Sequence, residues 1–381
     1  MPRIGCRQWQ SAQVIGGGVQ HDSQPTDGVE VETLAEFDVR AGTGSMAGCY
    51  LQSLDLTGRS DVLLATDLDR AVFLGCTFAP GVEAAIEAKG ALVFPTLPDL
   101  PFQPYRTGLY RPQELYAGLE RGYRYTLDAR TYRWWRHVGA QRSLTSELAM
   151  TLHDHAITDA LDDLALTSAV GVMGGHALER GSAGYAAAAQ LGRALVADGH
   201  PVLTGGGPGA MEAVNLGAAL PTEADLEGAV AALATVPSFG DAIEPWAQSA
   251  FAVAEGQSLT GPSYGVPTWL YGHEPPNVFC RGSAKLFSNA IREDALLRHA
   301  SAGLVCLAGA AGTVQEVFQA VTPRYYASSG PIPPLILVGV EYWTKTVPAW
   351  PLLEALAAGR RLEAAIHLVD DVADIPDLIH S

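Results

Sequence analysis

The sequence has little lysine, little cysteine and no long apolar run. Only three of its 24 basic residues are lysines (Lys89, Lys285 and Lys345), whereas 41 residues are acidic, giving a formal net charge of −17. Such a charge opposes non-specific binding to a nucleic-acid polymer or to an anionic membrane. We therefore expect a small-molecule ligand.

Cysteine usage and hydropathy indicate the cellular compartment. The five cysteines are scattered and lack C-x-x-C spacing, which favours neither a disulfide framework nor a zinc site and is typical of a reducing compartment. No stretch reaches the roughly 18 apolar residues that a membrane helix needs, and the first residues lack the apolar region of a signal peptide. We expect a cytoplasmic protein that binds no membrane.

What is present is enough chain for two folded domains. The 381 residues are 48% hydrophobic, and a domain averages roughly 150 residues, so each half can bury its own core. The texture of the sequence changes near residue 165. We predict an N-terminal domain of mixed, β-rich structure over 1–165, ending in a linking helix, and an α/β domain over 166–381.

Within the first half, large apolar residues recur every five positions. The series, with one two-residue slip, is Leu51, Leu56, Leu63, Leu68, Phe73 and Phe78. This spacing resembles the pentapeptide repeat, whose apolar centres point into a narrow β-helix. An ordinary meander of short strands explains the series equally well. Both interpretations predict a scaffold.

The segment from 93 to 142 interleaves aromatic residues with arginines. Such a pattern can stack bases and contact phosphates, but arginine stems also pack on aromatic rings inside a domain. The acidic net charge favours the packing interpretation. Apolar residues from about Ser146 to Leu164 then predict an amphipathic helix that leads into the second half.

After residue 166, short apolar strands, glycine loops and alanine-rich helices alternate. The pattern predicts strands over 168–173, 201–204, 303–307 and 335–340, and helices over 183–197, 210–219, 283–298 and 313–326. Continuous apolar strands that alternate with helices indicate a parallel sheet covered on both faces. We therefore predict a doubly wound α/β domain.

Three loops that follow predicted strands are rich in glycine. Ligands bind beyond the carboxyl ends of parallel strands, so these loops are the candidate site. Glycine lets backbone N–H groups approach an anion, and the helix that follows adds its positive end. Three such loops together predict a phosphate cradle. Its candidate binding residues are Gly174, Gly175, Gly205, Gly206, Gly207, Gly209, Met211, Gly309, Ala310, Ala311, Gly312 and Thr313.

Two of these segments resemble a known family. Gly205-Gly-Gly-Pro-Gly-Ala-Met-Glu212 and Ala308-Gly-Ala-Ala-Gly-Thr-Val-Gln-Glu316 are similar to the glycine loop and the P-G-G-x-G-T-x-x-E signature of the Lonely Guy (lysine-decarboxylase-like) family. The resemblance implies a Rossmann-like fold over about residues 166–370. It also implies a phosphoribohydrolase that cleaves the N-glycosidic bond of a nucleoside 5′-monophosphate. The stretch Pro-Gly-Ala-Met is closer to the broader nucleotide nucleosidases of the family.

The chain departs from the family at two places. Ala308 and Ala310 replace the proline and the second glycine of the signature, and Glu293-Asp294 stands where the family has an Arg-Lys pair. An acidic pair in place of a basic one puts substrate and activity in question without affecting the fold. Arg292 is the neighbouring replacement for the arginine, although it lies about 100° round a helix from Glu293.

The predicted helix over 283–298 still offers a polar face. Lys285, Asn289 and Arg292 are spaced i, i+4 and i+7, so they would project together toward a phosphate or a developing charge. The alternative is a solvated face on which Asp294 pairs with Arg298. We favour the binding role because this helix leads into the third glycine loop.

Glu316 has two interpretations. With Thr313 as N-cap, it would complete a Thr-x-x-Glu capping box with a structural role. The resemblance instead implies a catalytic carboxylate, and hydrolysis at an anomeric carbon needs one to activate water or to stabilise an oxocarbenium-like transition state. We favour the catalytic role for Glu316, with Arg292 orienting the sugar phosphate.

A polar segment between the loops, over 264–277, contains His273 and Glu274. A segment rich in proline and glycine inside a regular domain suits an active-site wall. These two residues are candidates for base recognition or for a second acid. A purely structural loop is equally compatible with the pattern.

The sequence thus predicts a hydrolase that releases base and ribose 5-phosphate from a nucleoside monophosphate, with no metal and no other cofactor. The alternative is a non-catalytic nucleotide- or phosphorylated-cofactor-binding protein, similar to molybdenum-cofactor carriers. A third hypothesis makes the N-terminal half a partner-binding scaffold, with the sheet mainly assembling dimers. We expect a homodimer or a higher homo-oligomer.

Overall fold

The chain divides into two units by its internal contacts. The computed structural model describes residues 28–380 except 142, 221, 241 and 273, and the division falls between Thr107 and Gly108. This is earlier than the boundary predicted near residue 165. Residues 108–165 group with the second unit because their partners lie there: Tyr110 forms an antiparallel bridge with Ser283, and Asp154 accepts hydrogen bonds from later backbone N–H groups.

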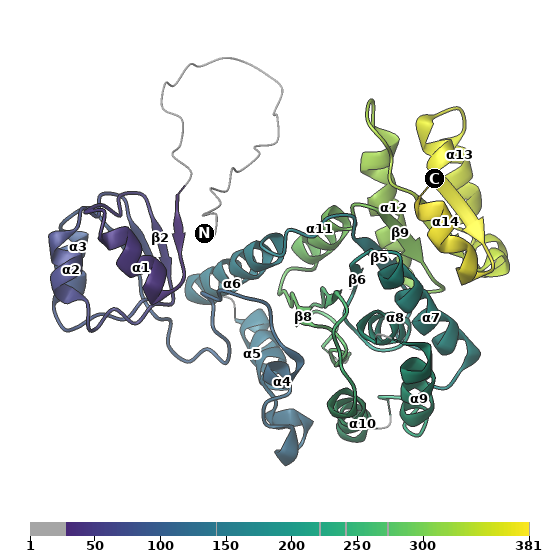
Figure 1. Ribbon diagram of the computed structural model, residues 1–381, viewed down its shortest axis with the longest axis horizontal. Coiled ribbons are helices and arrows are strands. Elements are labelled where there is room, and N and C mark those ends of the chain that lie inside the picture. Colours follow the sequence, from purple (N-terminus) through teal and green to yellow (C-terminus); the bar gives the residue numbers. More distant parts are fainter. Residues whose placement is uncertain (1–27, 142, 221, 241, 273, 381) are drawn as a thin grey trace. The chain divides into compact units, whose positions relative to one another are not determined.

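The N-terminal unit is a parallel sheet in which a helix follows each of the first three strands (Figure 1). The strand order is β1-β2-β3-β4. The elements are β1 Glu30–Val31, α1 Leu34–Ala41, β2 Tyr50–Gln52, α2 Ser60–Ala65, β3 Val72–Leu74, α3 Val82–Glu87 and β4 Leu92–Phe94.

The repeat of this unit is one strand and one helix. Glu30 pairs with Tyr50, Tyr50 with Val72 and Val72 with Leu92, so the repeat spans 20 to 22 residues, as in a strand-helix solenoid. The pentapeptide β-helix is wrong because helices connect the strands, and the meander is wrong because the strands pair in parallel. The apolar residues behind those predictions do form the core: Leu51, Leu56, Leu63, Leu68 and Phe73 are fully buried.

The C-terminal unit contains a seven-stranded sheet in the order β11-β10-β9-β5-β6-β7-β8, with every pair of strands parallel. Its strands are β5 Val170–Met173, β6 Val202–Thr204, β7 Ser263–Gly265, β8 Gly282–Ser283, β9 Gly303–Cys306, β10 Leu335–Val338 and β11 Ile366–Val369. Without β8, this is the 3-2-1-4-5-6 order of doubly wound dinucleotide-binding sheets. The predicted fold of the second domain is confirmed.

Helices cover both faces of this sheet. The labelled strands β5, β6 and β9 lie between α11 and α12 on one side and α7 and α8 on the other (Figure 1). Right-handed crossovers produce this arrangement when the chain reverses its direction of travel across a sheet. The helices are α4 Pro112–Leu115, α5 Leu127–Ala140, α6 Leu144–Asp162, α7 Ala183–Ala197, α8 Ala210–Ala219, α9 Glu223–Leu233, α10 Ile243–Gly256, α11 Asn289–His299, α12 Ala311–Tyr325, α13 Trp350–Ala357 and α14 Ile375–Ile379.

Several aromatic residues before α6 are buried, whereas most of the arginines among them are exposed and some lie over the rings. Tyr110 and Tyr116 are buried, and the guanidinium of Arg124 lies 4.6 Å from the ring centroid of Tyr125. These contacts agree with the packing interpretation of the segment. Among the described residues, no helix is both long and apolar enough to span a membrane.

Candidate functional site

The chain changes direction across the C-terminal sheet between β5 and β9. From β5 it proceeds through β6 and β7 to β8, and it then returns to β9 on the other side of β5. Ligands of doubly wound sheets bind in the crevice outside the carboxyl ends of the strands at such a switch point. The loops that begin at Gly174, Gly205 and Leu307 all lie at this carboxyl edge, as predicted.

The three loops bond to one another through their backbones. The N–H of Gly175 donates to the Ala308 carbonyl at 2.9 Å, and the N–H of Ala210 donates to the Gly175 carbonyl at 3.1 Å. Gly209 has a positive φ of 71°, and a Cβ there would lie 2.6 Å from the Gly175 carbonyl oxygen. Gly175 and Gly209 therefore serve the close approach of two chains, and the Gly175 N–H is already bonded within the protein.

The glycine loop after β6 is held in shape by Asn277. Its backbone N–H donates to the Gly206 carbonyl at 2.9 Å, and its Nδ2 donates to the Gly207 carbonyl at 3.0 Å. The N–H of Gly206 is not available to a ligand, because it donates to Oγ1 of Thr204. Asn277 lies in the segment predicted as a wall, but nothing in the sequence marks it as the residue that fixes the loop.

Arg292 and Glu316 form an ion pair at this edge, which we call the edge pair. Nη1 of Arg292 donates to Oε1 of Glu316 at 2.7 Å, and Nε donates to the Val266 carbonyl at 2.7 Å. Both side chains are mostly buried, with 8% and 9% of their surface exposed. A Cβ on Gly205 would collide with Nη2 of Arg292 and with the sulfur of Met211. The structure thus brings four predicted site residues together.

The edge pair keeps unused hydrogen-bonding capacity. Within the described part of the chain, the hydrogen bonds of the pair use Nε and Nη1 of Arg292 and Oε1 of Glu316, which leaves Nη2 and Oε2 unused. A guanidinium is a fixed fork of donors that matches the oxygens of a phosphate or a carboxylate. This pair can therefore accept a ligand without first breaking its own contact.

The N-terminus of α12 adds donors to the edge. Ala310 is the N-cap, and the N–H of Val314 makes the first intrahelical bond, to the Ala310 carbonyl at 3.1 Å. The N–H groups of Ala311, Gly312 and Thr313 therefore belong to the first turn, where an α-helix leaves donors free and carries partial positive charge. These are the predicted phosphate-binding positions of the third loop.

The capping-box interpretation of Glu316 is wrong. The helix begins two residues before Thr313, so Thr313 is its third residue rather than its N-cap, and no side chain caps this end. The side chain of Thr313 packs against Gly309 instead. Glu316 lies a turn further along α12, where Arg292 engages its carboxylate.

Glu293 and Tyr271 interact electrostatically with the edge pair. Glu293 is held by Nδ2 of Asn289 and Nε2 of Gln315, each 2.6 Å from one of its oxygens. Burial raises the pKa of Glu293, and the nearby Glu316 carboxylate raises it further. Burial also raises the pKa of Tyr271, with contributions from Glu293 and Glu316. Tyr271 therefore lies close to the pair, although the sequence did not mark it.

Lys285 is not on the predicted polar face. Helix α11 begins at Asn289, with Ser288 as its N-cap, so the i, i+4, i+7 relationship with Asn289 and Arg292 does not exist. The Lys285 side chain is 1% exposed, and its ammonium nitrogen lies 2.6 Å from a carboxylate oxygen of Asp128. It is a buried structural cation in this structure.

The alternative prediction for that helix, a pair between Asp294 and Arg298, is also wrong. Arg298 pairs with Asp162 at 2.8 Å and not with Asp294, because α6 lies beside the end of α11. Asn289 stays near Arg292, but its amide is used to hold Glu293.

The segment before Asn277 contributes Glu274 to the same edge. Its carboxylate lies 2.9 Å from Nδ1 of the exposed His176, and a Cβ on Gly207 would be 3.4 Å from its other oxygen. Glu274 therefore lies over the glycine loop after β6, as expected of a wall residue. His273 lies outside the described residues.

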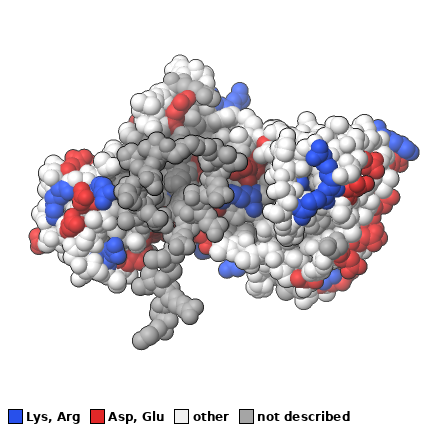
Figure 2. Space-filling view, turned by 90° about the horizontal axis from the view of Figure 1, so that it is seen from above, with Lys and Arg blue, Asp and Glu red and all other residues white. Residues whose placement is uncertain are grey.

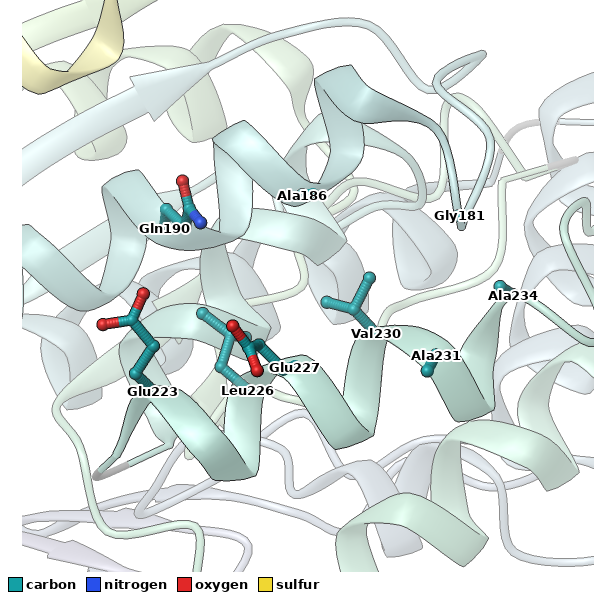
Figure 3. Close-up of a pocket in the computed structure, with 9 residues that line it drawn as sticks. All are labelled: Gly181, Ala186, Gln190, Glu223, Leu226, Glu227, Val230, Ala231 and Ala234. Atoms are coloured by element: carbon teal, nitrogen blue, oxygen red, sulfur yellow. The ribbon is translucent and has the colours of Figure 1, made fainter.

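A surface pocket between α7 and α9 does not include any of the predicted site residues (Figure 3). Ala186 and Gln190 line it from α7, and Leu226 and Val230 line it from α9, with two carboxylates, Glu223 and Glu227. Those carboxylates oppose an anionic ligand. The remaining lining residues are Gly181, Ala231 and Ala234.

Acidic and basic side chains both lie on the surface of the molecule. On the face shown in Figure 2, acidic and basic side chains are interspersed, and acidic side chains form large patches toward the right-hand edge.

Comparisons with protein-family models and with curated proteins find no match to this chain.

Proposed function

We propose that the protein hydrolyses the N-glycosidic bond of a nucleoside 5′-monophosphate at the carboxyl edge of β9, β5 and β6. The observation that carries the proposal is the edge pair, which lies against Gly205 with Nη2 of Arg292 and Oε2 of Glu316 unused. The similarity of the Gly205–Glu212 and Ala308–Glu316 segments to the Lonely Guy family supports the same reaction.

The phosphate would be bound by the first turn of α12. The N–H groups of Ala311, Gly312 and Thr313 supply donors and the positive end of the helix dipole, and Nη2 of Arg292 adds a charge-assisted hydrogen bond. The N–H groups of Gly175 and Gly206 take no part, since they bond within the protein. The phosphate site that we propose therefore uses fewer backbone N–H groups than the sequence predicts.

Glu316 would act on water. Its free oxygen Oε2 accepts a proton from the water molecule as the water oxygen bonds to C1′. The C1′–N bond breaks at the same time, and its electron pair leaves with the nucleobase. Solvent then protonates the released nucleobase. The carboxylate also stabilises positive charge that develops on the sugar ring. Arg292 donates to the other oxygen of Glu316, so it orients this general base as well as the phosphate.

The test is base release from a panel of nucleoside 5′-monophosphates, followed by chromatography. We expect release by the wild type and a fall of about 10²–10⁴-fold in Glu316→Gln, which removes the proton acceptor but keeps the side-chain shape. Glu227→Gln, on the exposed face of α9, is the matched control and should keep full activity. Release from no monophosphate would refute the proposal.

A non-catalytic binding protein is the second candidate function. Two observations favour it: Oε1 of Glu316 is already neutralised by Arg292 at 2.7 Å, and Glu293 occupies the position of a basic residue. Calorimetry with adenosine 5′-monophosphate distinguishes the two. Binding that is weakened in Arg292→Gln, together with no base release from the same nucleotide, would identify a carrier.

A further inference from the structure

Three side chains with metal-ligating atoms meet at the amino edge of the C-terminal sheet. Asp198 follows α7, His200 precedes β6, and His380 follows α14. Their ligand atoms all lie within 4.8 Å of one another. Because the strands are parallel, this edge is opposite the one that carries the edge pair, so the cluster is independent of the proposed function.

His200 is oriented as a metal ligand would be. Its Nδ1 lies 2.7 Å from the Ser168 carbonyl oxygen, which can only accept, so Nδ1 carries the proton and Nε2 presents a lone pair. A backbone carbonyl on the second ring nitrogen is the usual way in which proteins fix a metal-ligating histidine.

The lone pair of His200 has nothing to bond to in the described part of the chain. His200 is only 7% exposed, and its Nε2 is buried without a hydrogen-bond partner. Oδ2 of Asp198 lies 3.8 Å from this nitrogen, which is too long for a hydrogen bond. A buried acceptor without a partner is unfavourable, and a cation between these atoms would satisfy it.

The other two side chains complete a set of the right size. Nε2 of His380 donates a hydrogen bond to Oδ2 of Asp198 at 2.5 Å, and a metal ion would replace the proton of that bond. A tetrahedral ion with bonds of about 2.0–2.1 Å separates its ligand atoms by about 3.3 Å, a value between the two distances to Asp198 Oδ2. Asp198 and His380 are 36% and 55% exposed, so an ion can enter and water can take a fourth position.

We propose that Asp198, His200 and His380 bind a Zn²⁺ ion, with water as the fourth ligand. Two imidazole nitrogens and one carboxylate oxygen are donors that Zn²⁺ accepts in this geometry. The ion fastens the end of α14 to the turn between α7 and β6, so it acts as a clamp on the C-terminal segment.

The test is a titration of untagged, metal-depleted full-length protein with Co²⁺ at pH 7.5, followed in the visible region. We expect one equivalent to give the absorption of a four-coordinate ion, and Zn²⁺ to abolish it. Asp198→Asn and His380→Ala should each weaken Co²⁺ binding by about 100-fold or more, since even loss of an outer partner costs about 10–100-fold. His137→Ala, at an exposed histidine on α5, should bind as the wild type does.

Thermal unfolding separates loss of the site from loss of the fold. Asp198 and His380 are partly exposed, so both variants should unfold near the wild-type temperature without metal. Excess Zn²⁺ should raise the unfolding temperature of the wild type and of His137→Ala only. Absence of Co²⁺ binding, or binding that is equally strong in Asp198→Asn and His380→Ala, would overturn the proposal.

Discussion

Two arginine–glutamate pairs of the C-terminal unit, both largely buried, differ in how fully they are bonded. In the pair Arg180–Glu212, which we call the core pair, Nε and Nη2 contact both carboxylate oxygens, at 2.9 and 2.5 Å. Tyr185 also donates to Glu212, and Nη1 of Arg180 donates to the Trp246 carbonyl. The edge pair makes one contact between its side chains and leaves one nitrogen and one oxygen unused.

This difference is the one expected between a structural pair and the ligand-binding pair that we propose. The core pair is almost fully removed from solvent, at 1% and 0% exposure, so its charges are tolerable only because every polar atom is bonded. The Arg180 guanidinium also lies 4.4 Å from the ring centroid of Trp246. The edge pair retains some solvent contact and spare donors, as a site that exchanges water for a ligand requires.

The comparison is tested most strongly by Glu212→Ala. Removing Glu212 leaves the Arg180 charge buried without a partner, so we expect the free energy of unfolding to fall by about 3–5 kcal/mol. Urea denaturation followed by circular dichroism measures it. Glu227→Ala, at an exposed glutamate on α9, should change stability by less than about 0.5 kcal/mol. Equal effects in the two variants would remove the distinction between core and surface carboxylates.

Lys285→Met should have the next largest effect. It breaks the buried pair with Asp128, whose carboxylate then keeps only the hydrogen bonds from Trp269 and Tyr123, and we expect a loss of about 3 kcal/mol. Lys345→Met, at an exposed lysine, is the control. Phosphate affinity, measured by calorimetry, should not change in Lys285→Met. A weaker affinity with unchanged stability would show that Lys285 binds ligand after all.

Glu316→Gln should cost little stability. The amide oxygen still accepts from Arg292, so we expect a loss of about 1 kcal/mol. Glu212→Gln is the matched variant in the core pair and should cost clearly more, because its new NH₂ group faces a guanidinium nitrogen. The two variants are compared in one set of urea denaturation curves. If Glu316→Gln is the more damaging, the edge pair is structural and the comparison fails.

The smallest expected effect is the pH dependence contributed by Glu293. Burial raises its pKa, so the folded protein holds this proton more tightly than the unfolded chain does. Its contribution to stability is therefore present at low pH and lost as the pH rises through the folded-state pKa. Wild type should lose stability relative to Glu293→Gln between about pH 4 and 7, the range above the ordinary glutamate pKa. A difference between the two that stays constant with pH would contradict this.

Local sequence patterns were sufficient for the elements nearest the site. Helices α7 and α8 were predicted to the residue, at 183–197 and 210–219. Their starts are set by neighbours in the chain: Ser182 caps α7 by accepting from the Tyr185 N–H, and Gly209 turns the backbone into α8. The alternation of apolar strands and helices likewise indicated the parallel sheet.

Predictions that required a distant partner were less successful. The start of α11 was missed because Asp154, on α6, takes the backbone N–H groups of Phe287 and Ser288, which no local pattern reveals. The five-residue period of the first unit had a similar origin. The period arises because each longer repeat contributes buried residues from its strand, its turn and its helix. The length of that repeat is seen only from the pairing of Tyr50 with Val72.

The sequence by itself determined the doubly wound sheet and the three loops that reach its carboxyl edge, because hydrophobic periodicity and glycine turns act over a few residues. Only the tertiary structure decided which charges meet. Arg292 reaches Glu316 while Lys285 is taken by Asp128, and both outcomes depend on side chains brought together from separate elements. A charged side chain is available for a ligand only if packing has not already supplied its partner.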